Sequence, residues 1–171
     1  MRHRSFMLEC TPETFQSRMP DAGGLRAALA HRGDPDLCKR LWSEVGAEFW
    51  TERSRWDNKR WRKRLNQPNV SFWVAWVSGQ EAGCFELTKL ARGVKMEGFG
   101  LLPPYRGQGL GRDLLTAATQ QAFATGARRV WLHTATDDHP NALPNYLSGG
   151  YAIVRERELK NPIRSPAAPE T

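Results

Sequence analysis

The spacing of hydrophobic and polar residues divides the chain into short strands and amphipathic helices. Residues 70–77 are apolar at both alternating sets of positions, which predicts a strand that is buried on both faces. The other strand-like runs are bounded by turn-forming residues such as glycine, proline and asparagine. Strands are therefore expected at residues 5–11, 70–77, 81–90, 94–102, 130–135 and 151–158.

Helices are expected where apolar residues recur every three or four positions. Four apolar residues between positions 37 and 49 have this spacing, and Asp34-Pro35 before them provides a cap followed by proline. Asn141 is the predicted cap of the last helix, because it places Pro144 in the tolerant first turn. Helices are expected at residues 36–49, 58–65, from 110 to a stop at Gly126, and 141–148, with a short helical turn near residues 25–30.

This order of elements indicates one α/β domain over residues 1–160 of the 171-residue chain. A domain of this size can bury a substantial core. Residues 161–171 contain three prolines and no apolar periodicity, so a disordered tail is predicted there.

A glycine-rich loop joins the predicted strand 94–102 to the helix that begins at residue 110. It reads Arg106-Gly107-Gln108-Gly109-Leu110-Gly111-Arg112. Glycines allow backbone N–H groups to turn toward one point, and a helix N-terminus adds unpaired N–H donors and a positive dipole end. This combination predicts a site for an anionic ligand such as a phosphate. The alternative is an ordinary glycine-rich turn.

Two common phosphate-binding loops do not fit this spacing. A P-loop requires four residues between its glycines, followed by lysine and then serine or threonine. A dinucleotide fingerprint requires G-x-G-x-x-G and an acidic residue about twenty residues later. The chain offers G-x-G-x-G and has Arg128-Arg129 near that later position.

Composition narrows the class of protein further. Hydrophobic residues make up 40% of the chain and charged residues 25%, as in soluble globular proteins. The start of the chain lacks a signal-like apolar run, and no stretch has the length of a membrane span, so we expect a cytoplasmic protein without a membrane partner.

Cys10, Cys38 and Cys84 lie far apart and are predicted to be buried thiols, with no metal site. The net charge of +7 is spread along the chain rather than gathered in one stripe, so nucleic-acid binding is not expected.

The loop and a second block of residues resemble the GNAT superfamily of acyl-CoA-dependent N-acyltransferases. The pattern R-x-x-G-x-G is similar to the pyrophosphate loop of that family. Tyr146 precedes Gly150 and Tyr151 with the spacing of the family's last helix. Residues 133–140 read His-Thr-Ala-Thr-Asp-Asp-His-Pro, which resembles a stretch found in a bacterial subset of the family.

The resemblance implies a mixed, mostly antiparallel twisted sheet that is flanked by helices, with strands splayed at the cofactor cleft. The family usually adds a seventh strand that pairs with the sixth. Nothing after Lys160 can supply that strand, so we expect it to be absent. An uncovered sheet edge would then favour pairing with a neighbouring chain, and the protein is expected to be a monomer or a homodimer.

The resemblance also implies roles for individual residues. Tyr146 would protonate the leaving thiolate, and Glu97 would act as the base, although Lys95 stands where the subset tends to carry glutamate. Asp137, Asp138, His133 and His139 are the other candidate bases. The residues expected to bind the cofactor are Leu101, Leu102, Arg106, Gly107, Gln108, Gly109, Leu110, Gly111, Arg112, His139 and Asn141, and those expected at the acceptor are Trp50 and Trp56.

The expected function is the direct transfer of an acetyl group from acetyl-CoA, the co-substrate, to a primary amine of a small molecule such as a metabolite or an antibiotic. Two alternatives remain open. One is acetylation of a protein or peptide amine, and the other is a non-catalytic module that binds acyl-CoA.

Overall fold

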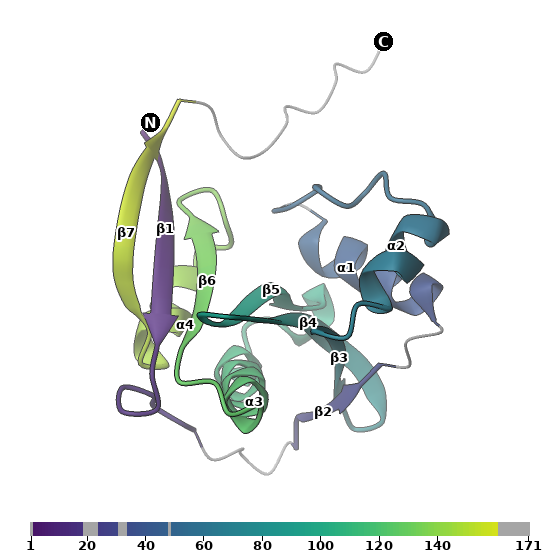
Figure 1. Cartoon of the computed structure of the whole chain (residues 1–171), viewed down its shortest axis with the longest axis horizontal. Coiled ribbons are helices and arrows are strands. Elements are labelled where there is room, and N and C mark those ends of the chain that lie inside the picture. The colour runs from purple at the N-terminus through teal and green to yellow at the C-terminus, as the bar shows by residue number, and fades with distance from the viewer. Residues whose placement is uncertain (1, 19–23, 31–33, 48, 161–171) are drawn as a thin grey trace.

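Seven strands form one sheet in the order β2-β3-β4-β5-β6-β1-β7. The computed structural model describes residues 2–18, 24–30, 34–47 and 49–160, so the tail predicted from residue 161 lies outside the described residues. Helices pack on both faces of the sheet (Figure 1). The strands are β1 (His3–Cys10), β2 (Arg26–Leu29), β3 (Val70–Val77), β4 (Gln80–Leu90), β5 (Gly93–Leu101), β6 (Val130–Ala135) and β7 (Ala152–Leu159). The helices are α1 (Pro35–Gly46), α2 (Asn58–Leu65), α3 (Leu110–Ala124), α4 (Ala142–Ser148) and a short 3₁₀ turn, Pro103–Tyr105.

The four predicted helices and six predicted strands are confirmed, with ends that shift by a few residues. Local capping explains where the first two helices begin. The Asp34 carboxylate accepts a hydrogen bond from the Leu37 N–H at 3.0 Å, and Asp57 accepts one from Arg60 at 2.8 Å. Asn141 is the N-cap of α4 by position, but its side chain makes no capping hydrogen bond.

The helical turn expected near residues 25–30 is wrong, because Arg26–Leu29 is a strand. It pairs antiparallel with β3, from Arg26 opposite Trp76 to Leu29 opposite Trp73. The segment Arg-Ala-Ala-Leu has a local preference for helix, but the open edge of β3 offers a row of unpaired N–H and C=O groups. Tertiary pairing therefore decides the structure of this segment.

The expected absence of a seventh strand is also wrong. The partner of the C-terminal strand β7 is the N-terminal strand β1, which lies between β6 and β7 (Figure 1). The pairing of β1 with β7 runs from His3 opposite Leu159 to Glu9 opposite Ala152. The strand that was not predicted is β2, at the opposite edge of the sheet, and the place beside β7 is taken by β1, a predicted strand from the other end of the chain.

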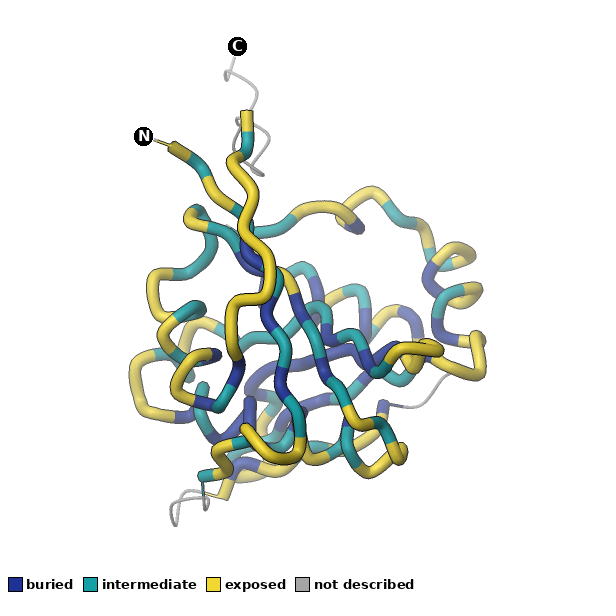
Figure 2. Tube along the Cα trace, turned by 60° about the vertical axis from the view of Figure 1, so that its left-hand side comes forward, coloured by how far each residue is buried: buried dark blue, intermediate teal, exposed yellow. Residues whose placement is uncertain are grey.

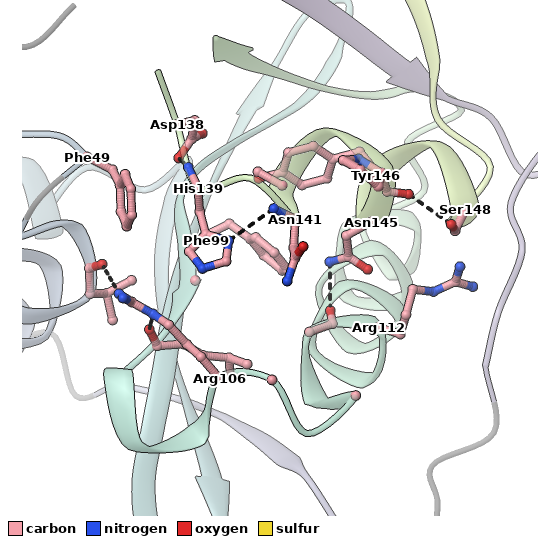
Figure 3. A pocket seen from close by; sticks show the side chains of 18 of the residues that line it. Phe49, Phe99, Arg106, Arg112, Asp138, His139, Asn141, Asn145, Tyr146 and Ser148 are labelled. Atoms are coloured by element: carbon pink, nitrogen blue, oxygen red, sulfur yellow. Dashed lines mark hydrogen bonds between the residues drawn. The ribbon is translucent and has the colours of Figure 1, made fainter. Parts of the chain in front are cut away.

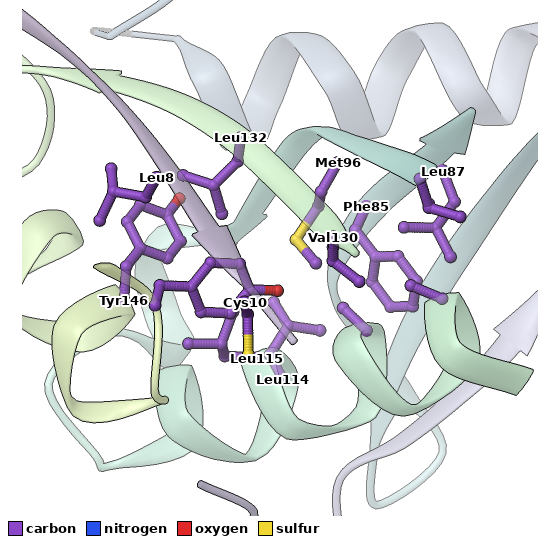
Figure 4. Close-up of a cluster of buried hydrophobic side chains, with 14 of the residues drawn as sticks. Leu8, Cys10, Phe85, Leu87, Met96, Leu114, Leu115, Val130, Leu132 and Tyr146 are labelled. Carbon is purple, nitrogen blue, oxygen red and sulfur yellow. The ribbon is translucent and has the colours of Figure 1, made fainter. Parts of the chain in front are cut away.

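Two hydrophobic clusters lie on opposite faces of the sheet. The first packs α3 and α4 against the sheet and includes Phe85, Leu114 and Val130 (Figure 4). The second packs α1 and α2 against the other face and includes Leu41 and the fully buried Trp61. Because both faces are covered at the centre, the strands there are apolar on both sides, as in residues 70–77.

Two irregularities in β5 open the middle of the sheet. β5 and β6 run parallel and pair only at Val94 with Val130 and Lys95 with Trp131, so the strands separate beyond these residues. β5 also holds one more residue than β4 between successive pairs, which is a β-bulge at Gly98. Gly98 has a φ of 57°, and a Cβ there would lie 2.2 Å from the Trp42 ring. The bulge therefore needs glycine.

Candidate active site

A cavity of about 370 Å³ opens at the gap between β5 and α4, beside the glycine loop. Gly107 and Gly109 have φ values of 74° and 78°, and α3 begins directly after them at Leu110. No side chain caps this helix N-terminus. The first N–H groups of a helix have no partner within the helix, so the start of α3 can donate to an anion.

Eight of the eleven residues predicted to bind the cofactor line this cavity. They are Leu101, Arg106, Gly107, Gly109, Gly111, Arg112, His139 and Asn141. Leu102, Gln108 and Leu110 do not line it. The Leu102 N–H donates to the Ala82 carbonyl at 2.8 Å, and the Gln108 amide donates to the Pro104 carbonyl at 2.9 Å. Leu110 is buried in the core below α3.

The two arginines of the loop have different surroundings. Arg106 donates to the backbone carbonyls of Leu101 at 3.2 Å and Val45 at 3.1 Å, so it ties α1 to the end of β5. Arg112 donates to the Gln16 carbonyl at 3.3 Å. Figure 3 shows Arg106 on the opposite side of the cavity from Arg112. Of these two arginines, Arg112 is held by fewer printed hydrogen bonds and lies nearer the start of α3, while the Arg18 guanidinium also reaches the loop, where it donates to the Gly109 carbonyl at 3.4 Å.

Asn145 is a cavity residue that the sequence analysis missed. Its amide donates to the Gly111 carbonyl at 3.0 Å, which joins α4 to the glycine loop. The Asn145 Oδ1 atom is buried and has no hydrogen-bond partner. This oxygen can accept a hydrogen bond from a polar ligand in the cavity. Asn145 follows the N-cap residue Asn141 by four positions, so the two side chains are expected on the same side of α4. This spacing could have indicated that Asn145 lies near the cofactor site.

Tyr146 lies at the inner end of the cavity, packed against Phe99 with ring centroids 5.7 Å apart. Burial raises the pKa of Tyr146 well above the usual tyrosine value, and the negative charge of Asp138 raises it further. The Tyr151 hydroxyl is bonded to Thr119 at 2.8 Å, whereas the Tyr146 hydroxyl makes no hydrogen bond within the described part of the chain. Tyr146 therefore keeps its proton at neutral pH, and its hydroxyl is not engaged by another described residue.

A second cavity, of about 340 Å³, lies on the side of the sheet that α1 and α2 cover. Its lining residues come from segments that are far apart in the sequence: Ser5; Trp42, Phe49, Trp50, Glu52 and Arg53; Lys95, Met96, Glu97, Gly98 and Phe99; and Leu132, His133, Thr134, Ala135, Asp137, Asp138 and Tyr146. The two cavities share five residues, which are Phe49, Trp50, Phe99, Asp138 and Tyr146. A group that enters from one side can therefore meet a group from the other side at Tyr146.

Glu97 lines the second cavity, where three cations hold its carboxylate. It accepts hydrogen bonds from Arg53 at 2.8 Å and pairs with Lys95, while Arg64 lies 3.6 Å away. Burial acts to raise the pKa of Glu97, but the bond from Lys95 and the neighbouring positive charges outweigh burial and lower it. The carboxylate is therefore ionised but a weak proton acceptor.

Arg53 is the centre of a buried charge network that the sequence analysis did not foresee. Its guanidinium makes two hydrogen bonds to Glu86, at 2.7 and 2.9 Å, and Arg64 donates to the same carboxylate. Glu86 is fully buried and Arg53 is 6% exposed. The ion pair is therefore shielded from water. In such a buried environment, removing one partner and leaving the other charge unpaired is costly.

Three tryptophan rings surround the guanidinium of Arg53. The Arg53 guanidinium lies 3.9 Å from the Trp42 ring centroid, 4.8 Å from Trp56 and 5.3 Å from Trp61. Trp56 lines neither cavity, and its ring also contacts Arg60 and Trp61. Trp50 lines both cavities, so it remains a candidate to contact the acceptor.

The other candidate bases lie near the junction of the cavities. Asp138 lines both cavities, and it accepts hydrogen bonds from Thr134 and from the His139 N–H at 2.8 Å each. His139 packs edge-on against Phe49 in the first cavity. His133 lines the second cavity, and burial together with nearby positive charges lowers its pKa.

Several solved structures share this fold. A GCN5-related N-acetyltransferase from Kribbella flavida is 25% identical with a TM-score of 0.62, and the match covers 88% of this chain and 54% of that one. A spermidine N-acetyltransferase from Vibrio cholerae, solved with CoA and spermine, is 20% identical with a TM-score of 0.61, over 74% of this chain and 79% of that one. An aminoglycoside acetyltransferase from an uncultured soil sample is 22% identical with a TM-score of 0.61, over 73% and 86%. The chain thus spans about half the length of the Kribbella protein.

None of the helices in the described part of the chain has the length and apolar character that a membrane crossing requires. A comparison with curated proteins finds no significant match. Residues 35–151, which include both cavities except Ser5, match the acetyltransferase (GNAT) family. The splayed strands, the glycine loop at a helix start and this match agree, and the chain therefore belongs to the GNAT acetyltransferase family.

Proposed function

We propose that the protein transfers an acetyl group from acetyl-CoA directly to a primary amine of a small molecule. The observation that carries this proposal is the meeting of two cavities at Tyr146, one beside an anion-binding loop and the other lined by charged side chains. A direct transfer requires two substrates to approach one point from different sides. The buried, free cysteines are typical of a reducing compartment, and we include a cytoplasmic location in the proposal.

The first cavity suits the phosphates and the arm of coenzyme A. The N–H groups at Gly107, Gly109 and the start of α3 would hold the diphosphate, with Arg112 beside them. The unpaired Asn145 oxygen would accept a hydrogen bond from an amide N–H of the arm. When bound, acetyl-CoA supplies the thioester, whose C–S bond breaks as the bond between carbon and the amine nitrogen forms.

Tyr146 would supply the proton that the departing thiolate needs. Its pKa is raised by burial and by Asp138, so the phenol is protonated at any pH at which the enzyme works. Its hydroxyl is unpaired and lies where the cavities meet. General acid catalysis requires this combination of position and protonation.

Two carboxylates compete for the role of proton acceptor from the amine. Glu97 is the base predicted from the resemblance, but its bonds to Arg53 and Lys95 weaken it. Asp138 lines both cavities, and its charge acts on Tyr146. We therefore favour Asp138 as the proton acceptor. Glu97 would then be only a lining residue of the second cavity. The result expected is a larger loss of kcat in Asp138→Asn than in Glu97→Gln.

The test follows free thiol release from acetyl-CoA with a broad panel of amines. Tyr146→Phe is expected to lower kcat by about 100-fold while CoA affinity in calorimetry is unchanged. Tyr151→Phe is the matched control, because its hydroxyl is bonded to Thr119 away from both cavities. It should reduce stability by about 1 kcal/mol and leave kcat unchanged. Thiol release that is equal in the two variants contradicts the role of Tyr146.

One observation favours the non-catalytic alternative, in which the chain only binds acyl-CoA. The expected base, Glu97, is held by three cations. If CoA binds but no amine in the panel releases thiol above buffer, this alternative replaces the proposal.

A further inference from the structure

One face of the strands β6, β1 and β7 continues from the second cavity to the edge of the sheet. Met7 of β1 lies opposite His133 of β6 on one side and opposite Arg155 of β7 on the other. Residues that are directly opposite in an antiparallel sheet point to the same face. Arg155 therefore projects on the same face as His133, which lines the second cavity.

The next row of the sheet repeats this arrangement. Ser5 lies opposite Ala135 on one side and Arg157 on the other, and Ser5 and Ala135 both line the second cavity. β7 is exposed along most of its length (Figure 2). Arg155 and Arg157 do not themselves line the cavity, but they project from β7, the edge strand of the sheet among the described residues, on the face that the cavity occupies.

The charged side chains on the two faces of β7 differ in whether they form ion pairs. On the opposite face, Glu156 pairs with Arg4 at 2.8 Å and Glu158 with Arg2 at 3.6 Å. Arg155 and Arg157 make no ion pair with any described residue. Burial lowers the pKa of His133, and the positive charges of Lys95, Arg155 and Arg157 lower it further, as expected for cations on the same face of the sheet.

The inner end of the same cavity has the opposite charge. Asp137 and Asp138 line it beside Tyr146, where the acetyl group would be transferred. Lys95 is paired with Glu97 at the middle of the wall, so its charge is largely neutralised. The cavity therefore has carboxylates at its reacting end, and Arg155 and Arg157 project beside its outer side, from the strand next to Ser5.

We infer that the acceptor is an amine that also carries an anionic group, a carboxylate or a phosphate, which Arg155 and Arg157 bind. This inference rests on the proposed function and specifies its substrate class. The amine would lie near Asp138 and Tyr146, and the anionic group near β7. A polycation would instead place positive charge against both arginines, at an energetic cost.

The experiment measures binding rather than turnover. Calorimetry of the full chain saturated with CoA compares matched amines: phosphoethanolamine with ethanolamine, glucosamine 6-phosphate with glucosamine, and β-alanine with β-alaninamide, with spermidine as the polycation. At least one anionic member is expected to bind about tenfold more tightly than its neutral partner. The Arg155→Gln/Arg157→Gln double variant should lose this preference, and added salt should reduce it in the unmodified protein.

Arg62→Gln/Lys63→Gln is the matched control, because it removes two positive charges from exposed positions on α2. It should keep the preference. The inference is overturned if no anionic amine binds more tightly than its neutral partner, if spermidine binds best, or if the β7 double variant keeps the preference. Failure of the proposed function is seen separately, as absence of CoA binding or of thiol release with every amine.

Discussion

The two cavities that meet at Tyr146 are built in different ways. The cavity beside the glycine loop depends largely on backbone geometry, in residues 106–112 and the start of α3. The second cavity, which we propose as the acceptor site and call the acceptor cavity, depends on side chains from strands and loops that are far apart in the sequence, with a buried ion pair beside it. A cofactor common to a family can be held by one short motif. A variable acceptor requires a wall whose side chains can change without changing the fold.

The largest effect is expected from breaking the ion pair beside the acceptor cavity. Arg53→Met removes a guanidinium that is 6% exposed from a fully buried Glu86 carboxylate, and Arg64 alone cannot replace both of its hydrogen bonds. The free energy of unfolding should fall by about 3 kcal/mol, as measured by urea denaturation. Arg40→Met is the control, because the Arg40–Glu81 pair is at the surface and its loss should cost below about 1 kcal/mol. Equal losses would show that burial of the network contributes nothing.

The same contrast explains which parts of the site could be predicted. The glycine loop was predictable because its residues are consecutive and each positive φ needs glycine locally. The partners of Arg53 are 33 and 44 residues away in sequence, and no local pattern indicates that Glu86 and Glu97 meet it. The contact of the Arg53 guanidinium with the Trp42 ring likewise joins two different segments, and no local pattern indicates it.

The fold shows the same division between local and distant determinants. Periodicity and caps predicted the four helices and six of the strands, because Asp34 and Asp57 act on residues three positions away. The strand β2 and the place of β1 beside β7 were missed, since both depend on an edge formed by distant segments. Four residues such as Arg26–Leu29 carry too little local preference to resist that pairing.

A moderate effect is expected from a single methyl group in the cofactor loop. Gly107 and Gly126 both have positive φ, 74° and 86°, and a Cβ at either position would meet no atom within 4 Å. Alanine at either site should therefore cost a similar 1–2 kcal/mol of stability, roughly, through backbone strain alone. Only Gly107→Ala should weaken CoA binding in calorimetry, by about tenfold, because Gly107 lines the cavity and Gly126 ends α3 far from it. An equal loss of affinity in both variants would mean that the loop does not hold the cofactor.

The smallest effect is the contribution of Glu97, in the second cavity, to the pH dependence of stability. The pKa of Glu97 is lower in the folded protein than its ordinary value of 4.5, because the bond from Lys95 and the nearby cations outweigh burial. A lowered folded pKa stabilises the protein above the ordinary value, and this contribution is lost as the pH falls through the folded value. Glu97→Gln should thus cost under about 1 kcal/mol at pH 7 and progressively less as the pH falls below about 4. Urea denaturation of both proteins over this range measures the difference, and a constant difference contradicts the assignment. Tyr146→Phe should show no such trend there, because the raised pKa of Tyr146 keeps the phenol protonated throughout.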